Sequence, residues 1–232
     1  MKTIKTILSL VCRAIIDAFL PQSKEVKMLL QNGRELLKER ESLRDAPFGA
    51  LAIFEYRDPL VKTLVWEIKY RGNMNLTSLA SEFLLEELTS CLSEAELFQN
   101  FTDPILIPIP LSPARSRERG FNQCERIAEA MEKTMKKTMK KSGAGIFTLR
   151  KDILMKKDKA RRQTETKNKT ERVKNIRGSF VINANCSIKA SIKGRNIILL
   201  DDVVTTGATL EEASRVLKAA GARKILKIAL AH

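Results

Sequence analysis

The segment that most constrains this chain covers residues 197–210 and reads IILLDDVVTTGATL. Four consecutive aliphatic residues predict a buried strand, and two adjacent acids, Asp201 and Asp202, follow at its carboxyl end. A turn of small, hydroxylated residues then precedes a helical pattern that starts near Thr209. This order of strand, turn and helix is typical of an open parallel sheet covered by helices, in which ligands bind at the carboxyl ends of the strands.

The turn at 205–209 has the features of a phosphate-binding loop. Its backbone N–H groups and the positive end of the following helix dipole can bind an anion, and Gly207 permits close approach of the backbone. The sequence contains neither a Walker A loop nor a dinucleotide-binding fingerprint. The alternative is an ordinary turn in which Thr205 or Thr206 caps the helix. We favour the phosphate site, because two acids directly after four aliphatic residues are costly to bury without a ligand.

Patterns in the rest of the chain support an α/β class with an open, mostly parallel sheet flanked by helices. Short apolar runs predict strands at 49–55, 104–109, 146–149, 178–182, 196–200 and 223–230. Helical patterns alternate with them at 58–70, 76–90, 122–137 and 209–220. Two further helical patterns, at 4–19 and 23–44, come first. We therefore expect an N-terminal helical segment at 1–45 and one α/β domain at 46–232.

Composition limits the chemistry and the partners. The net charge of +15 favours polyanions, and residues 133–195 hold 20 basic and 4 acidic residues but few aromatics, chiefly Phe147 and Phe180. The four cysteines form no Cys-x-x-Cys pair and the only histidine, His232, is the final residue, so we expect neither zinc nor histidine-based catalysis. No apolar run is long enough to cross a bilayer, and charged residues interrupt the N-terminal one, which favours a cytoplasmic protein.

Residues 197–210 resemble the phosphoribosyl-diphosphate (PRPP) motif of the type I phosphoribosyltransferases. The resemblance implies that Asp201 and Asp202 hold the ribose hydroxyls. It also implies that the 5′-phosphate binds to the turn residues, which are Thr205, Thr206, Gly207, Ala208 and Thr209.

A second segment resembles the ComF (competence protein F) branch of that superfamily and its GntX-like relatives. The sequence IPIPLS at 107–112 is followed by Arg115, Arg117 and Arg119-Gly-Phe-Asn-Gln. Two prolines predict a stiff loop after the strand, and the three arginines can bind a diphosphate by bidentate contacts. The alternative is a solvated basic turn. Residues 66–72 and 163–180 also resemble family segments, so the likeness runs from about residue 48 to 232.

The chain differs from the ComF pattern at two places. ComF relatives usually begin with a cysteine-rich zinc ribbon, and two helical patterns take its place here. Residues 156–172 are basic and almost free of apolar side chains, which predicts a mobile loop. The resemblance implies that this loop closes over the ligand as a lid, with lid residues Arg161, Arg162, Gln163 and Arg172.

The resemblance as a whole implies a transferase that moves the phosphoribosyl group from PRPP to an unidentified acceptor and releases diphosphate. Mg²⁺ would bind together with PRPP near Asp201 and Asp202. Two alternatives stay open: an accessory protein in DNA uptake, which would contact nucleic acid weakly through residues 133–195, and a PRPP-sensing regulator without turnover. The sequence is compatible with an oligomer.

Overall fold

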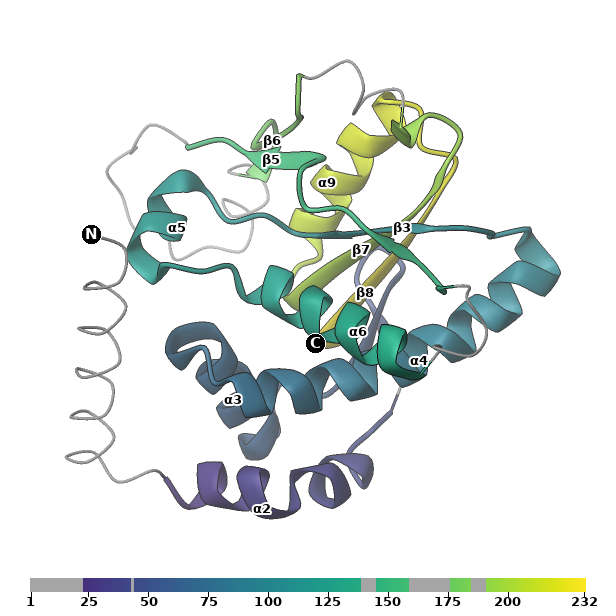
Figure 1. Cartoon of the computed structure of the whole chain (residues 1–232). Coiled ribbons are helices and arrows are strands. Elements are labelled where there is room, and N and C mark those ends of the chain that lie inside the picture. The colour runs from purple at the N-terminus through teal and green to yellow at the C-terminus, as the bar shows by residue number, and fades with distance from the viewer. Residues whose placement is uncertain (1–22, 43, 139–144, 159–175, 185–190) are drawn as a thin grey trace.

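The computed structural model describes residues 23–42, 44–138, 145–158, 176–184 and 191–232. A six-stranded sheet lies at its centre, in the order β1-β2-β8-β7-β3-β4 (Figure 1). The parallel strands are β2 (Ala50–Phe54), β3 (Ile105–Pro108), β4 (Thr148–Leu149), β7 (Asn196–Val203) and β8 (Lys224–Ala231). Only the edge strand β1 (Arg44–Ala46) is antiparallel to its neighbour in this sheet. The predicted open, mostly parallel sheet is confirmed.

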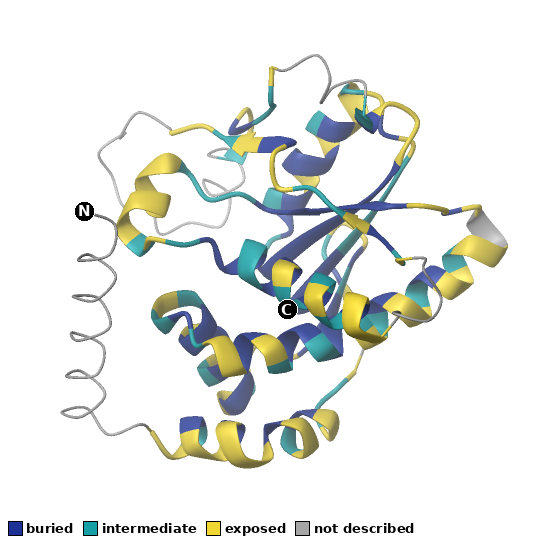
Figure 2. Ribbon diagram, viewed as in Figure 1, coloured by how far each residue is buried: buried dark blue, intermediate teal, exposed yellow. Residues whose placement is uncertain are grey.

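Helices cover both faces of the sheet, and the sequence of β7 explains why. Ile198 and Leu200 pack into one core with helices α3 (Pro59–Trp66), α4 (Met74–Gln99) and α6 (Gln123–Thr138). The alternate residues Ile197 and Leu199 pack into a second core with α9 (Ala208–Ala219). Side chains of a strand point alternately to its two faces, so a continuous aliphatic strand must be covered on both. Figure 2 shows the central strands as buried, between partly exposed helices.

The helix α2 (Lys24–Lys38) lies outside the layer formed by α3 and α4 (Figure 1). It is capped by Ser23, whose Oγ accepts a hydrogen bond from the Val26 N–H. Leu29 and Leu37 of this helix are buried in the same core as the apolar residues of α3 and α4. Arg34 on this helix forms ion pairs with two glutamates of α4. Residues 1–22 lie outside the described ranges, and the boundary between 1–45 and 46–232 stays a prediction.

Two helical segments differ from the sequence-based prediction. The helix predicted at 58–70 changes from α to π geometry at η1 (Glu67–Arg71), and it ends at Gly72, which has a left-handed φ of 58°. The segment after β3, predicted to be a stiff loop, forms α5 (Pro113–Arg119). Ser112 caps this helix through its Oγ, which accepts from the Arg115 N–H, and Pro113 occupies the first turn, where proline is favourable.

A separate antiparallel pair, β5 (Leu154–Lys156) and β6 (Phe180–Ile182), lies beside α9 on one face of the sheet (Figure 1). Leu154 and Phe180 anchor it in the same core as α9. None of the helices in the described ranges is long and apolar enough to span a membrane.

Candidate functional site

A cavity of about 660 Å³ lies at the carboxyl ends of β3 and β7. Its walls come from the turn after β7, from α5, from the first turn of α6 and from the ends of the β5–β6 pair. The predicted site residues that line it are Asp201, Asp202, Thr205, Thr206, Gly207, Thr209, Arg115 and Arg119. The fold therefore brings together segments that the sequence separates by about ninety residues, at the edge where parallel α/β sheets bind ligands.

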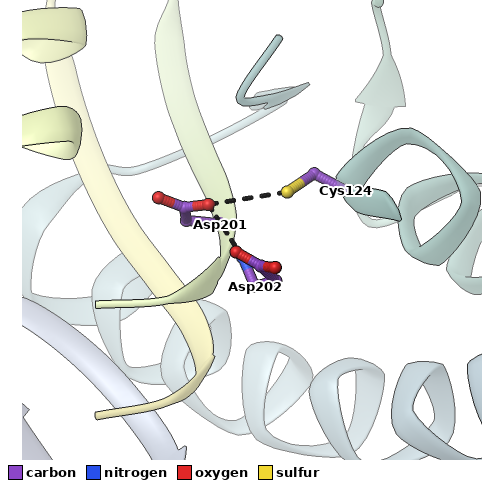
Figure 3. A group of neighbouring side chains, drawn as sticks. All are labelled: Cys124, Asp201 and Asp202. Atoms are coloured by element: carbon purple, nitrogen blue, oxygen red, sulfur yellow. Dashed lines mark hydrogen bonds between the residues drawn. The ribbon is translucent and has the colours of Figure 1, made fainter. Parts of the chain in front are cut away.

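Backbone hydrogen bonds hold the two acids in fixed orientations. Asp201 Oδ1 accepts from the Asp202 N–H, and Asp202 Oδ1 accepts from the Val203 N–H, both at 2.9 Å. Asp201 and Asp202 are only 8% and 6% exposed. Figure 3 shows the thiol of Cys124, on α6, pointing toward them; its Sγ donates to Asp201 Oδ1 at 3.5 Å. The acids are thus buried and ordered at the base of the cavity.

Two side chains from other elements contact Asp202, and a third reaches it through one of them. Gln123 Nε2 donates to Asp202 Oδ2 at 3.1 Å, and Lys69 Nζ lies 3.4 Å from the same oxygen. Arg119 Nη1 in turn donates to Gln123 Oε1 at 2.8 Å. A cation from η1 and an amide from α6 therefore compensate the charge of Asp202, and Gln123 links this carboxylate to α5.

The environment of Asp201 favours its neutral form. Burial, followed by the nearby charge of Asp202, raises the pKa of Asp201 from 3.8 to about 7. Burial and the same two acids raise the pKa of the Cys124 thiol well above its ordinary value. Near neutral pH, Asp201 is therefore only partly ionised.

This raised pKa predicts a pH-dependent stability difference between the wild type and Asp201→Asn. The folded wild type binds a proton at Asp201 more tightly than the unfolded chain does, so the contribution of Asp201 to stability falls as the pH rises from about 4 to about 7 and then levels off. Asparagine stays neutral and lacks this loss. The melting temperature of Asp201→Asn minus that of the wild type should therefore increase across this window. A difference that stays constant with pH would contradict the raised pKa.

The predicted phosphate-binding turn packs tightly against the β1–β2 hairpin. Gly207 is the N-cap of α9 and has a φ of 73°, and a Cβ atom added there would lie 2.8 Å from the Pro47 carbonyl oxygen and 2.6 Å from the Phe48 ring. Lys227 Nζ donates to the Phe48 carbonyl and to Glu211 Oε2 of α9, both at 2.8 Å. Only glycine fits this position, and the brace through Lys227 holds the turn against the hairpin.

The three arginines of α5 divide between two directions. Arg115 and Arg119, four residues apart, share a face of the helix and line the cavity. The Arg117 side chain is 74% exposed, and its Nη2 atom lies 3.5 Å from Asp158 Oδ2. Asp158 Oδ1 also accepts from the Ala114 N–H at 2.9 Å. Two of the three arginines of the predicted diphosphate site therefore line the cavity, and Arg117 contacts the segment after β5 instead.

One of the predicted turn residues, Ala208, is not among the residues that line the cavity.

The predicted lid residues Arg161, Arg162, Gln163 and Arg172 lie outside the described ranges, and the lid stays a prediction. The described residues on either side of this segment do reach the cavity. They are Lys156, Lys157, Asp158, Ile176 and Ser179.

Sequence reasoning assigned no role to Lys69, Gln123 or Cys124. Lys69 lies in the ComF-like segment at 66–72, and Gln123 lies at the end of the one that begins at residue 107. The resemblance of these segments to the family was therefore the sequence signal available for both residues. Cys124 follows Gln123 directly, but as an isolated cysteine it carried no signal. Its place beside the acids becomes apparent only when α6 is packed on β7.

The acids fit a magnesium ion that is bound jointly with a phosphate ligand. Cys124, Asp201 and Asp202 offer ligand atoms within 4.8 Å of one another, and they are the one such group in the part of the chain that the structure describes. Mg²⁺ prefers oxygen ligands and commonly uses one or two carboxylates together with substrate phosphates. A protonated thiol is not a ligand for this hard cation, so the carboxylates would hold it.

Comparison with known proteins agrees with this arrangement. The family description "Phosphoribosyl transferase domain" matches residues 143–232. The competence protein ComFC of Streptococcus pneumoniae is 31% identical over 179 residues, which cover 77% of this chain and 66% of that protein. The chain belongs to the ComF family.

Other ComF relatives are similar over nearly the same span. ComFC of Bacillus subtilis is 31% identical over 72% of this chain and 56% of its own length. The DNA utilization protein YhgH of Escherichia coli K12 is 22% identical over 75% of this chain and 68% of its own. The chain thus spans less than two thirds of the length of the two ComFC relatives. A hypoxanthine-guanine phosphoribosyl transferase of L. donovani superposes with a TM-score of 0.36 at 11% identity over 67% of each chain.

Proposed function

We propose that this protein binds PRPP with Mg²⁺ and transfers its phosphoribosyl group to an acceptor, with release of diphosphate. The convergence of three groups in one cavity carries the proposal: two buried acids, a glycine-containing turn at the start of a helix, and two arginines on one helix face. Each group has the chemistry that one part of PRPP requires. Membership of the ComF family and the phosphoribosyl transferase domain match support the same reading.

Each part of the cavity would bind a different part of the ligand. Asp201 and Asp202 would accept hydrogen bonds from the ribose hydroxyls. The backbone N–H groups of 205–209, at the positive end of α9, would bind the 5′-phosphate. Arg115 and Arg119 would bind the diphosphate. Magnesium, when bound, neutralises charge on the diphosphate.

Positioning and electrostatics are sufficient for this reaction. Displacement at the ribose C1 passes through a state with oxocarbenium character while diphosphate leaves, so the protein needs to orient the reactants, neutralise the leaving group and exclude water. No histidine is required. His232 is accordingly available for a structural contact, and its Nδ1 lies 2.9 Å from the Val204 carbonyl oxygen.

Calorimetry with PRPP tests the proposal. We expect a saturable heat of binding that requires Mg²⁺ and that is larger than the heat obtained with ribose 5-phosphate, which lacks the diphosphate. Release of diphosphate is then measured with a panel of bases and amines as acceptors. The absence of binding heat at every magnesium concentration would contradict PRPP binding. Binding heat without diphosphate release from any acceptor would contradict transfer and favour the PRPP-sensing role.

A further inference from the structure

The side-chain amide of Gln123 lies between two charged groups that the proposed function assigns to different parts of PRPP. Its Nε2 donates to Asp202 Oδ2 at 3.1 Å, and its Oε1 accepts from Arg119 Nη1 at 2.8 Å. Asp202 would bind the ribose, and Arg119 would bind the diphosphate. We call Arg119, Gln123 and Asp202 the polar series. Gln123 is only 4% exposed, so a broken bond in the series would leave a buried polar group unpaired.

Only one orientation of this amide satisfies both of its neighbours. A guanidinium can only donate hydrogen bonds, and the oxygens of a carboxylate accept them. Turning the amide over would place its NH₂ group against Arg119 and its oxygen against Asp202. Each charged group therefore fixes the amide in the orientation that the other one needs. A change at one end of the polar series is thereby transmitted to the other end.

Neighbouring residues of η1 support both ends of the polar series. The guanidinium carbon of Arg119 lies 5.0 Å from the centroid of the Tyr70 ring. Lys69, the residue before Tyr70, places its Nζ 3.4 Å from Asp202 Oδ2, the oxygen that Gln123 also contacts. The same turn of helix thus restrains the arginine at one end and the carboxylate at the other.

The middle of the polar series is fixed to the central sheet. Gln123 is the first residue of α6, and Asn122 lies directly before it. Asn122 Oδ1 accepts from the Cys124 N–H, and its Nδ2 donates to the carbonyl of Ile109, directly after β3, both at 3.0 Å. These bonds cap α6 and tie its start to the strand. The backbone of Gln123 is therefore held in place beneath its amide.

We propose that Gln123 is a positioning residue that couples the diphosphate subsite to the ribose subsite. The inference rests on the proposed function and deepens it. When diphosphate holds Arg119 in place, the amide is held in turn, and Asp202 keeps the orientation in which it accepts from the ribose. The second half of the ligand then binds to a site that is already ordered. Because such coupling is reciprocal, ribose 5-phosphate and diphosphate should each raise the affinity for the other.

Calorimetry measures this coupling with the two halves of PRPP as separate ligands. The full chain is titrated with ribose 5-phosphate at one fixed Mg²⁺ concentration, first alone and then with diphosphate at saturation. The coupling factor is the dissociation constant of ribose 5-phosphate without diphosphate divided by that with diphosphate. In the wild type we expect a coupling factor of about five or more. Equal dissociation constants in the wild type would overturn the inference.

Two substitutions of Gln123 break the polar series in different ways. Gln123→Met keeps the length of the side chain but has no N–H to donate to Asp202. Gln123→Asn keeps the amide but is one methylene shorter, so it cannot reach both neighbours. A thermal melt first shows that each variant is folded at the assay temperature, and the coupling factor should then be lower by about threefold or more. The matched control is Gln31→Met, at an exposed position of α2, which should keep the wild-type factor.

The two cavity arginines give a second test that leaves Gln123 in place. Arg119→Ala and Arg115→Ala each remove a guanidinium from the same face of α5, so each should weaken diphosphate binding. Arg119 is bonded to Gln123, whereas Arg115 is not part of the polar series. With diphosphate raised to saturate each variant, Arg119→Ala should therefore lower the coupling factor and Arg115→Ala should retain it. Equal coupling factors in these two variants would contradict a path through Gln123.

The coupling factor also separates positioning from a merely structural role. A structural role would make Gln123→Met and Gln123→Asn weaken ribose 5-phosphate binding equally with and without diphosphate. The coupling factor would then stay at its wild-type value, and this result would overturn the inference while the PRPP proposal stands. Absence of binding heat with PRPP itself in the wild type would instead refute the proposed function, on which the inference rests.

Discussion

The double variant Asp201→Asn/Asp202→Asn is expected to bind Mg²⁺–PRPP about a hundredfold more weakly or not at all, and to melt at the same temperature as the wild type or higher. The ribose loses two charged acceptors, each of which contributes on the order of 1.5–3 kcal/mol. The unliganded protein loses the repulsion between two close, buried carboxylates. Calorimetry and a thermal melt measure the two effects separately.

The matched control for this variant is Asp152→Asn. Asp152 has a side chain that is 51% exposed and pairs with Arg150, away from the cavity lining. This substitution should leave PRPP affinity unchanged. In the double variant Lys69 loses its carboxylate partner, but its side chain is 27% exposed and so keeps contact with water. Wild-type PRPP affinity in the double variant would refute the assignment of these acids to the ribose.

Gly207→Ala is expected to lower both the melting temperature and the PRPP affinity, the latter by at least about tenfold. The substitution adds left-handed backbone strain of roughly 1–2 kcal/mol. It also places a methyl group against the Pro47 carbonyl, which is backbone and cannot rotate away. The turn and the β1–β2 hairpin must separate, and the backbone N–H groups lose the arrangement that binds the 5′-phosphate.

Gly194→Ala separates backbone strain from collision. Gly194 has a φ of 72°, nearly that of Gly207, but an added Cβ meets no atom within 4 Å. This control should lose stability through strain alone and retain its PRPP affinity. Equal loss of affinity in the two variants would mean that the effect of Gly207→Ala comes from destabilisation rather than from the turn.

Contiguous stretches of sequence were sufficient to predict the central part of the fold. The run of aliphatic residues, the two acids, the glycine turn and the following helix are encoded within residues 197–210, and the structure has β7 and α9 there. Such patterns are readable because the period of a strand or helix and the requirements of a turn are local properties. Ser112 and Pro113 carried a local helix-start signal as well, and recognising it would have separated Arg117 from Arg115 and Arg119.

Tertiary packing alone decided which side chains complete the site and how they ionise. Lys69 and Gln123 reach Asp202 from elements 133 and 79 residues away, and no local pattern encodes such a contact. The Arg119 guanidinium lies over the Tyr70 ring, 49 residues away in the chain, which is again a long-range contact. The raised pKa of Asp201 follows first from its burial, which only the folded chain produces. The sequence by itself determined the strand, the acids and the turn; their neighbours depend on long-range packing, since desolvation and charge act through space.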